Sequence, residues 1–346
     1  MLNTVFRIVI GLPLVAGGAA QADGPPLLDA GRLPYLSDAG RADYGRFLLQ
    51  PTPRVFALAP DGAWGWAAAI EDDPAATEAR ALENCRRWGG QACTVYARDL
   101  AVVWPGLEAR PPATPARPLA GGTGWSLQPD GRFLWQGPAQ ARGAYLWAHG
   151  RSPGGADSRG SQPQPHVRAF NNAGYDVIRL DRDPVTDETE AGAAWMREAL
   201  RLLRRQGYAR VVAGGQSRGA WNALQALEEP GLADAIIAIA PAAHGPRGSA
   251  AQAWALDDLK RIVDAAQSRG TRVAVANFAG DEFDPDPVAR AAILSGLAPR
   301  SGGLLLLDRP RGITGHGGGG DWRFTFGYAG CLLDFAEGRR DRCAGE

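Results

Sequence analysis

The sequence of 346 residues lacks several features that would point to a particular class of partner or cofactor. Its formal net charge at pH 7 is zero, so neither a polyanion such as nucleic acid nor a charged membrane surface is implied as a partner. It contains no HExxH or CxxC motif and no carboxylate cluster that would indicate a metal site. No basic, aromatic-rich face suggests nucleic-acid binding. We therefore predict a globular protein that works without a metal or a cofactor.

Long apolar runs are also missing, apart from a short one near the N-terminus. Arg7 precedes this run, and Ala20-Gln21-Ala22 fits the small-x-small rule for cleavage after the last alanine. The run is too short, and too broken by a proline and glycines, to cross a bilayer comfortably. The sequence therefore predicts a signal peptide over residues 1–22, a periplasmic or secreted mature protein, and no membrane span.

Cysteines are few, with four in the chain. Cys85 and Cys93 are close in sequence, and so are Cys331 and Cys343, although three pairings of four cysteines are possible. An oxidising compartment favours disulfides over free thiols. Because the two pairs fall in different modules of the chain, we predict local pairing within each module.

The N-terminal part of the chain has the pattern of a small α+β unit. Two expected strands, residues 55–59 and 63–67, flank a Pro-Asp-Gly turn. Asp73 then marks the N-cap of a helix, and a further strand begins at Cys93. We predict a disulfide-stapled α+β domain over residues 23–104.

A proline-rich linker is expected over residues 105–119, which contain four prolines between positions 111 and 118. The domain before it resembles small uncharacterised domains of secreted bacterial proteins that carry a similar PDG-x-W-G-W turn and paired cysteines. This resemblance implies no activity. We expect Trp64 and Trp66 to pack in the core of this domain rather than to form an exposed binding surface.

Residues 120–346 alternate apolar strands with amphipathic helices, which implies a mostly parallel sheet covered by helices on both faces. We therefore predict an α/β fold with a doubly wound sheet. The expected strands are residues 131–136, 144–148, 175–180, 209–213, 233–240, 272–278 and 303–307, and the expected helices are residues 164–173, 190–205, 220–227, 252–268, 286–296 and 324–335.

One stretch organises this domain: Gly215-Gln216-Ser217-Arg218-Gly219 joins a strand to a helix and matches the pattern G-x-S-x-G. The small residues at both second neighbours of the serine let strand and helix approach closely, and the apex serine must adopt a strained backbone. The hydroxyl would then stand clear of the sheet at the N-terminus of the helix, where free N–H groups lie.

Polar residues follow other expected strands at the carboxyl edge, where sites of such sheets lie. Serine, acid and histidine occur in that order along the chain, which is the order in α/β-hydrolases. The residues concerned are His149-Gly150-Arg151, Ser217, the loop from Asp281 to Asp284, and His316. On these motifs, the region resembles the α/β-hydrolase superfamily, of the serine esterase or dienelactone-hydrolase-like kind.

The resemblance implies a catalytic triad. Ser217 would be the nucleophile, His316 the base that takes its proton, and Asp281 the acid that orients the imidazole. Asp284 is the alternative acid, since many members of the superfamily carry the acid several residues past the strand. His244 is a weaker candidate for the base.

The developing oxyanion needs preorganised donors. The backbone N–H of Arg218 and one from Gly150 or Arg151 are the candidates, and His149 is expected to shape this loop. Residues 242–256 are a candidate cap over the site.

The function that we expect is hydrolysis of a small-molecule carboxylic ester by an exported serine hydrolase through an acyl-enzyme. A peptidase or acyltransferase with the same triad is the alternative within enzymes. A non-catalytic envelope-binding protein on a hydrolase fold is the alternative outside them. The sequence does not name the substrate or the oligomeric state.

Overall fold

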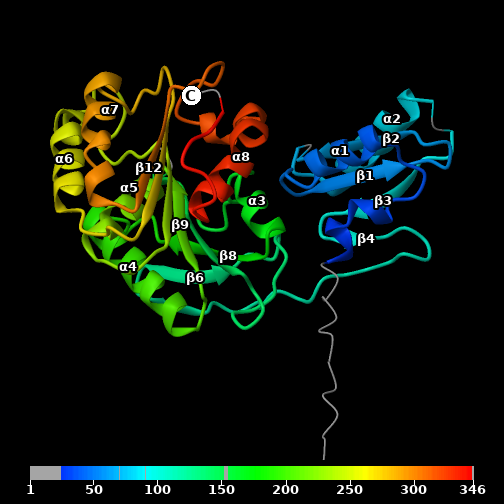
Figure 1. Ribbon diagram of the computed structural model, residues 1–346, viewed down its shortest axis with the longest axis horizontal. Helices are drawn as coiled ribbons and strands as arrows, with labels where there is room; N and C mark the ends of the chain where they lie inside the picture. Colours follow the sequence, from blue (N-terminus) through cyan, green and yellow to red (C-terminus); the bar gives the residue numbers. More distant parts are fainter. Residues whose placement is uncertain (1–24, 70, 90, 152–154, 345–346) are drawn as a thin grey trace, which may run out of the picture.

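The computed structural model describes residues 25–69, 71–89, 91–151 and 155–344, so the predicted signal peptide lies outside the described residues. Two sheets, one of four strands and one of eight, organise the chain (Figure 1). Within the described ranges, we find no helix with the length and apolar character that crossing a membrane would need.

The four-stranded sheet is antiparallel, in the order β2-β1-β3-β4, and carries two helices. Asp73 caps the second of these helices, because its side chain accepts a hydrogen bond from the Ala75 N–H at 2.8 Å. The indole N–H groups of Trp64 and Trp66 both donate to Asp43, and both rings pack against the apolar core, as expected. The elements are α1 (Asp38–Phe47), β1 (Arg54–Leu58), β2 (Trp64–Ala68), α2 (Pro74–Arg87), β3 (Thr94–Arg98) and β4 (Ala101–Val102).

Both cysteine pairs form the local disulfides that the sequence predicts. Cys85, in α2, is bonded to Cys93 just before β3, which fixes this helix to the sheet beneath it. Cys331 is bonded to Cys343 near the end of the chain.

The eight-stranded sheet has the order β12-β11-β10-β9-β7-β8-β6-β5. Its strands are parallel from β12 to β8, whereas β6 runs antiparallel to β8 and β5 antiparallel to β6. The strands are β5 (Ala120–Gly122), β6 (Trp125–Pro129), β7 (Gly143–Ala148), β8 (Tyr175–Arg182), β9 (Val211–Gln216), β10 (Ala235–Ile239), β11 (Arg272–Asn277) and β12 (Gly303–Asp308). This strand order, with its antiparallel second strand, is that of the α/β-hydrolase fold, so the predicted fold class is confirmed.

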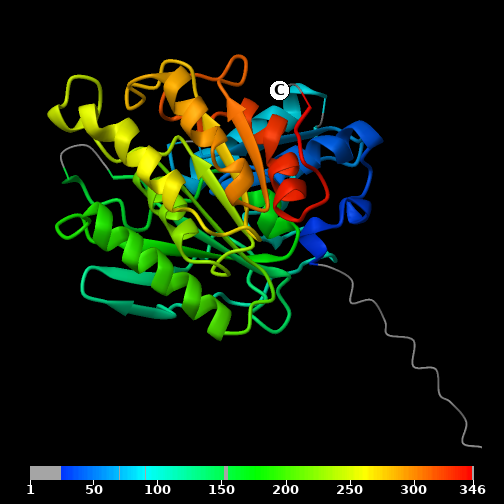
Figure 2. The same cartoon turned by 60° about the vertical axis from the view of Figure 1, so that its left-hand side comes forward.

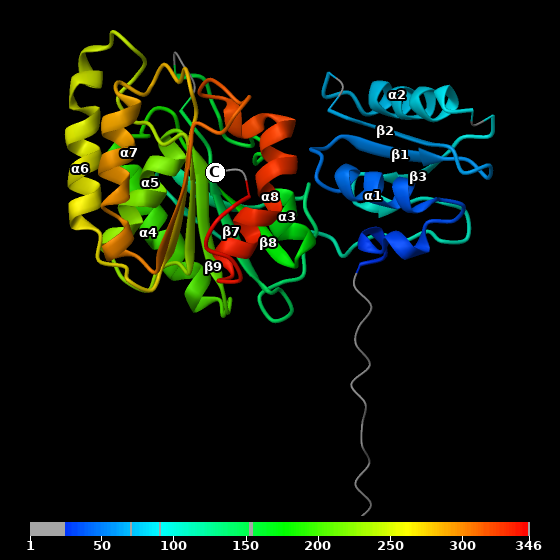
Figure 3. The ribbon, with the colours of Figure 1, turned by 45° about the horizontal axis from the view of Figure 1, so that its top comes forward.

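Helices cover both faces of this sheet (Figures 1 and 3). One face packs against α4 (Thr189–Arg205), α5 (Arg218–Gln225), α6 (Ala255–Ala265) and α7 (Pro287–Ser295), and the other against α3 (Val167–Asn172) and α8 (Trp322–Ala336). Figure 2 shows α4 and α6, in green and yellow, across the near face of the sheet. Because both faces are buried, the central strands are continuously apolar, with all five residues of β10 buried.

The predicted strand over residues 131–136 is wrong. This segment is irregular because side chains, and not a neighbouring strand, bind its backbone: Asn171 bonds both the N–H and the carbonyl of Leu134, and Asp176 accepts from the Gln136 N–H. Phe133 is buried all the same, which explains the strand-like apolar pattern. The strand in this region is β6, which ends where the Pro-Asp-Gly turn begins.

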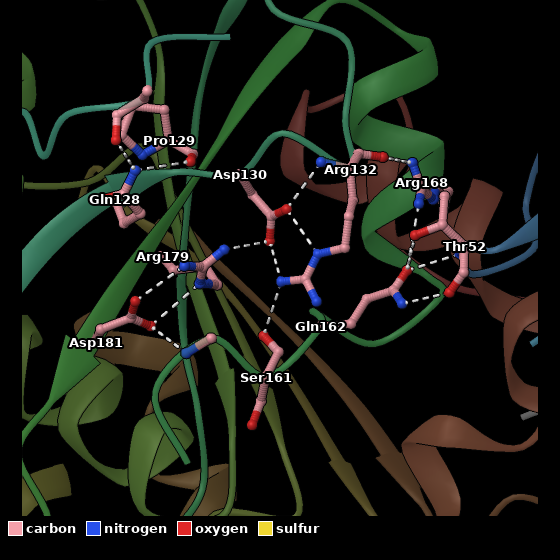
Figure 4. A network of polar contacts seen from close by, with 12 residues as sticks. Thr52, Gln128, Pro129, Asp130, Arg132, Ser161, Gln162, Arg168, Arg179 and Asp181 are labelled. Atoms are coloured by element: carbon pink, nitrogen blue, oxygen red, sulfur yellow. Dashed lines mark hydrogen bonds and ion pairs between the residues drawn. The ribbon is translucent and has the colours of Figure 1, made fainter. Parts of the chain in front are cut away.

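The two sheets are joined by polar contacts near α3 (Figure 4). Thr52, which precedes β1, exchanges hydrogen bonds with the side chain of Gln162 at 2.8–3.2 Å. Asn172 at the end of α3 donates to the carbonyl of Leu48 at 3.1 Å. Arg168 on α3 also donates to Gln162, so α3 is linked to the segment between α1 and β1 directly through Asn172 and indirectly through Gln162.

Candidate active site

Ser217 stands in the tight turn between β9 and α5 and has a strained backbone. Its φ and ψ angles are 55° and −120°, which a non-glycine residue rarely adopts. The Ser217 N–H donates to the Ile239 carbonyl at 3.0 Å, and the Ser217 carbonyl accepts from the Trp221 N–H at 3.0 Å. The turn is therefore held by hydrogen bonds from the next strand and from its own helix.

The glycines around Ser217 are required by the close approach of β7. A Cβ atom on Gly219 would lie 2.0 Å from the carbonyl oxygen of Ala148, and one on Gly215 would lie 2.5 Å from the same oxygen. No side-chain rearrangement can relieve a clash with backbone. The G-x-S-x-G pattern therefore reflects strand–helix packing as well as the conformation of the serine.

Gly219→Ala is expected to destabilise the protein by about 3 kcal/mol, because the added methyl group forces the start of α5 away from β7. Urea unfolding followed by circular dichroism measures this loss. Gly327→Ala is the matched control, since Gly327 is also helical and an added Cβ meets no atom within 4 Å. We expect the control to equal or exceed the parent in stability. Parental stability of Gly219→Ala would contradict the packing argument.

Asp281 and His316 are in contact beyond the carboxyl ends of β11 and β12. The imidazole Nδ1 lies 3.0 Å from each carboxylate oxygen of Asp281, whose side chain is 1% exposed. The two loops are joined by the Gly315 N–H, which donates to the Ala279 carbonyl at 2.8 Å. The ring of Phe283 covers the imidazole, with 4.2 Å between the ring centroids. Thus the acid and histidine loops are held together by these contacts, and the Asp281 carboxylate is buried.

The second imidazole nitrogen of His316, Nε2, is buried and has no hydrogen-bond partner among the described residues. Asp281 accepts a hydrogen bond from the protonated Nδ1, so Nε2 is left as an acceptor. Gln216, the neighbour of Ser217 in the turn, donates from its side-chain amide to the His316 carbonyl at 3.4 Å. This contact ties the histidine loop to the serine turn.

Asp284, the alternative acid, has a different partner. Its carboxylate lies 3.7 Å from Arg290, both side chains are 2% exposed, and Arg290 also donates to the Pro241 carbonyl at 2.6 Å. Burial raises the pKa of Asp284, and the charge of Arg290 opposes this shift. Among the described contacts, it is Asp281 and not Asp284 that bonds His316.

His149 orients the loop that borders Ser217. The Arg182 N–H donates to its Nε2 at 3.0 Å, so the ring proton is on Nδ1, which donates to the Gly150 carbonyl at 2.6 Å. Burial, aided by the charge of Arg182, lowers the pKa of His149 to about 4, and the ring is neutral at pH 7. Because the peptide is planar and trans, the Arg151 N–H points away from His149.

Gly150 and Arg218 both lie next to the serine. A Cβ on Gly150 would come within 3.2 Å of the Ser217 Cβ, so this loop runs directly beside the nucleophile candidate. Arg218 is the first residue of α5, and its N–H has no acceptor within the helix. The loop at Gly150 and the start of α5 therefore both adjoin Ser217.

A cavity of about 620 Å³ opens on Ser217. Its lining comes largely from the predicted cap segment, together with the two arginines next to the serine and Phe283. Among the lining residues, His244 has its own acid, since its Nε2 lies 2.5 Å from Asp258, and its ring packs on Trp221. His244 therefore contacts Asp258, whereas Asp281 contacts His316.

The sequence missed several contacts around the site. Gln216 stands inside the recognised motif, but no pattern shows that its amide reaches the His316 loop. Phe283 and Arg290 follow Asp281 closely, yet their contacts depend on how the loop folds. Within the described residues, no group of three or more histidine, cysteine, aspartate or glutamate side chains is arranged to hold a metal ion.

Comparisons with solved structures find distant similarities. The chain is similar to the acylaminoacyl peptidase of Pyrococcus horikoshii, with 14% identity and a TM-score of 0.42, over 63% of this chain and 39% of that one. It is similar to an α/β-hydrolase candidate of unknown function from Agrobacterium tumefaciens, with 15% identity and a TM-score of 0.46, over 66% and 98% of the two chains. A puromycin-hydrolyzing peptidase of Mycobacterium tuberculosis has 14% identity and a TM-score of 0.47, over 80% and 45%.

The chain thus spans less than half the length of either peptidase. At these identities and TM-scores, the activities of these proteins carry no implication for this chain, and the fold assignment rests on the strand order and the serine turn. No protein-family model matches the sequence, and no curated protein matches it.

Proposed function

We propose that this protein is an exported serine hydrolase that cleaves a carboxylic ester, with Ser217 as nucleophile, His316 as base and Asp281 as orienting acid. The observation that carries the proposal is the imidazole of His316. One nitrogen is bonded to a buried carboxylate, the other is free to accept a proton, and the loop is tied to the serine turn by Gln216. A histidine with this environment is what activation of a serine hydroxyl requires.

In the first half of the reaction, the Ser217 hydroxyl passes its proton to His316 Nε2 as its oxygen bonds to the ester carbon. The negative charge on the former carbonyl oxygen is stabilised by the N–H groups of Arg218 and of Gly150 or Arg151. His316 then gives the proton to the departing alkoxide, and an acyl-enzyme remains. Asp281 keeps the imidazole in the required tautomer and stabilises its charged form.

In the second half, a water molecule replaces the alcohol. His316 removes a proton from the water as its oxygen bonds to the acyl carbon, and the same oxyanion donors stabilise the intermediate. The proton returns to the serine oxygen as its bond to the acyl carbon breaks, which releases the carboxylic acid. No cofactor takes part in this scheme.

Export is the second part of the proposal. The N-terminal pattern supports removal of residues 1–22, and two disulfides fit an oxidising compartment. The small α+β domain over residues 23–104, the linker over 105–119 and the catalytic domain over 120–346 are the units that we propose for the mature chain.

A fluorophosphonate probe tests the nucleophile assignment. We expect it to label Ser217 alone, as read by peptide mass spectrometry, and to abolish turnover of 4-nitrophenyl esters in proportion to labelling. The reason is that the probe reacts with a serine only where a base activates the hydroxyl. Labelling at another serine, or ester turnover without any labelling, would reject Ser217 as the nucleophile.

A further inference from the structure

The cavity beside Ser217 contains a buried arginine without an acidic partner. Arg218 is 6% exposed and lines this cavity. Its guanidinium donates only to backbone carbonyls, those of Asp187 at 3.3 Å and Ala243 at 3.2 Å, and its Nε has no hydrogen-bond partner among the described residues. A buried charge of this kind is costly unless a counter-charge is supplied.

The acid whose charge acts most strongly on Arg218, Asp187, is already bonded to another arginine. The Asp187 carboxylate is bonded to Arg182 at 2.9 Å, and both side chains are almost fully buried. Two buried arginines, Arg182 and Arg218, therefore share the buried Asp187 carboxylate. The other acids near them do not replace it, because Asp181 is paired with Arg179 and Glu188 is exposed to solvent. Burial is the main cause that lowers the pKa of Arg218. The charge of Asp187 opposes this shift, and the charges of Arg151 and Arg182 act in the same direction as burial. A guanidinium stays protonated despite such shifts.

The other charged side chains of the cavity do not cancel the charge of Arg218. Arg151 lines the cavity from the loop that borders the serine, which adds a second guanidinium. Glu282 also lines it. Glu282 and Arg151 are both exposed to solvent, which screens the charge of each, so the buried positive charge is that of Arg218. His244 is paired with Asp258. The buried side of the cavity is therefore positive next to the reacting serine.

We propose that the substrate carries a carboxylate close to the scissile ester, and that Arg218 and Arg151 bind this carboxylate while Ser217 attacks. The inference rests on the proposed ester hydrolysis and deepens it, because it names the substrate class: monoesters of dicarboxylic acids. A planar guanidinium suits a carboxylate, since it offers parallel N–H donors to both oxygens. The substrate would thus supply the missing counter-charge.

The test compares the 4-nitrophenyl monoester of glutaric acid with its neutral carbamoyl analogue, which has nearly the same shape. We expect the parent to prefer the acidic ester by roughly 10- to 100-fold in kcat/KM, as for a charge-assisted hydrogen bond. The preference should shrink as salt is added. Arg218→Met and Arg151→Met should each remove most of it, mainly through KM.

A second variant, a control variant and a protection experiment complete the test. Arg151 is exposed, so Arg151→Met tests the proposal even if Arg218→Met does not fold. Arg247→Met is the matched control, because Arg247 is an exposed arginine of the same cap segment that does not line the cavity, and it should keep the parental preference. Free glutarate should slow fluorophosphonate labelling of Ser217 more than glutaramide does.

Equal turnover of the two esters by the parent would overturn the carboxylate proposal, and so would an unchanged preference in both arginine variants. In either case, labelling and ester turnover persist, so the proposed hydrolase function stands. If the parent protein showed neither labelling nor turnover of any ester, the hydrolase function would instead be rejected, and the substrate proposal with it.

Discussion

Ser217→Ala is expected to lower kcat for ester hydrolysis by about 10⁶-fold while the protein stays folded. The hydroxyl oxygen is the atom that forms the acyl-enzyme, and no other group at the turn can replace it. Alanine has the same Cβ, so it accommodates the strained backbone as serine does. Steady-state kinetics gives the loss, and thermal unfolding checks the fold.

Ser295→Ala is the control for this experiment. Ser295 is exposed on α7, and its hydroxyl donates to the Ala291 carbonyl within its own helix. It should keep parental turnover and stability. If Ser217→Ala retained substantial turnover while the control behaved as expected, another residue would have to be the nucleophile.

The core of the fold follows from the sequence because buried parallel strands leave a clear pattern. The strand at residues 233–240 is an apolar run that corresponds to β10, and the amphipathic helix at residues 190–205 is α4. The edge of the sheet was not predictable in the same way. β5 consists of Ala120–Gly122, and so short a glycine-rich segment has neither alternation nor bulky side chains.

Residues 131–136 were predicted to form a strand, but they are irregular. Phe133 and Leu134 are buried like strand residues, but Asn171 takes over the backbone bonds of Leu134. The apolar pattern reports burial, and it cannot report whether a strand or a side chain satisfies the backbone. Such a substitution depends on residues far away in the sequence.

Some parts of the candidate site could be predicted from the sequence, and others could not. Ser217, Asp281 and His316 could be proposed because each follows a strand at the carboxyl edge, and their chain order is characteristic. The buried positive charge of Arg218 could not be predicted from the sequence, because it depends on Asp187 being bonded to Arg182. Contacts between distant loops leave no local pattern.

Asp281→Asn is expected to lower kcat by about 10⁴-fold with little change in stability. Asp284→Asn should lower the stability and leave kcat close to that of the parent. An asparagine at position 281 can present its amide N–H to the imidazole Nδ1, which would place the ring proton on Nε2. His316 could then no longer accept the serine proton. Kinetics on each purified variant measures this loss.

Asp284→Asn should instead destabilise the protein by about 3 kcal/mol, because it leaves Arg290 buried without its carboxylate partner. The fraction that remains folded should turn over ester at a rate close to that of the parent. Asp284 is buried, so a readout of stability as well as of activity is needed to separate the two roles. Urea unfolding of both variants, beside kinetics below the unfolding transition, provides this pair of measurements.

The crossed design makes each contrary outcome informative. A large loss of kcat at Asp284 with normal turnover at Asp281 would transfer the orienting role to Asp284, against the contact between Asp281 and His316. Normal turnover in both folded variants would mean that neither carboxylate orients the imidazole. The triad would then be rejected even if Ser217 still reacted with fluorophosphonate.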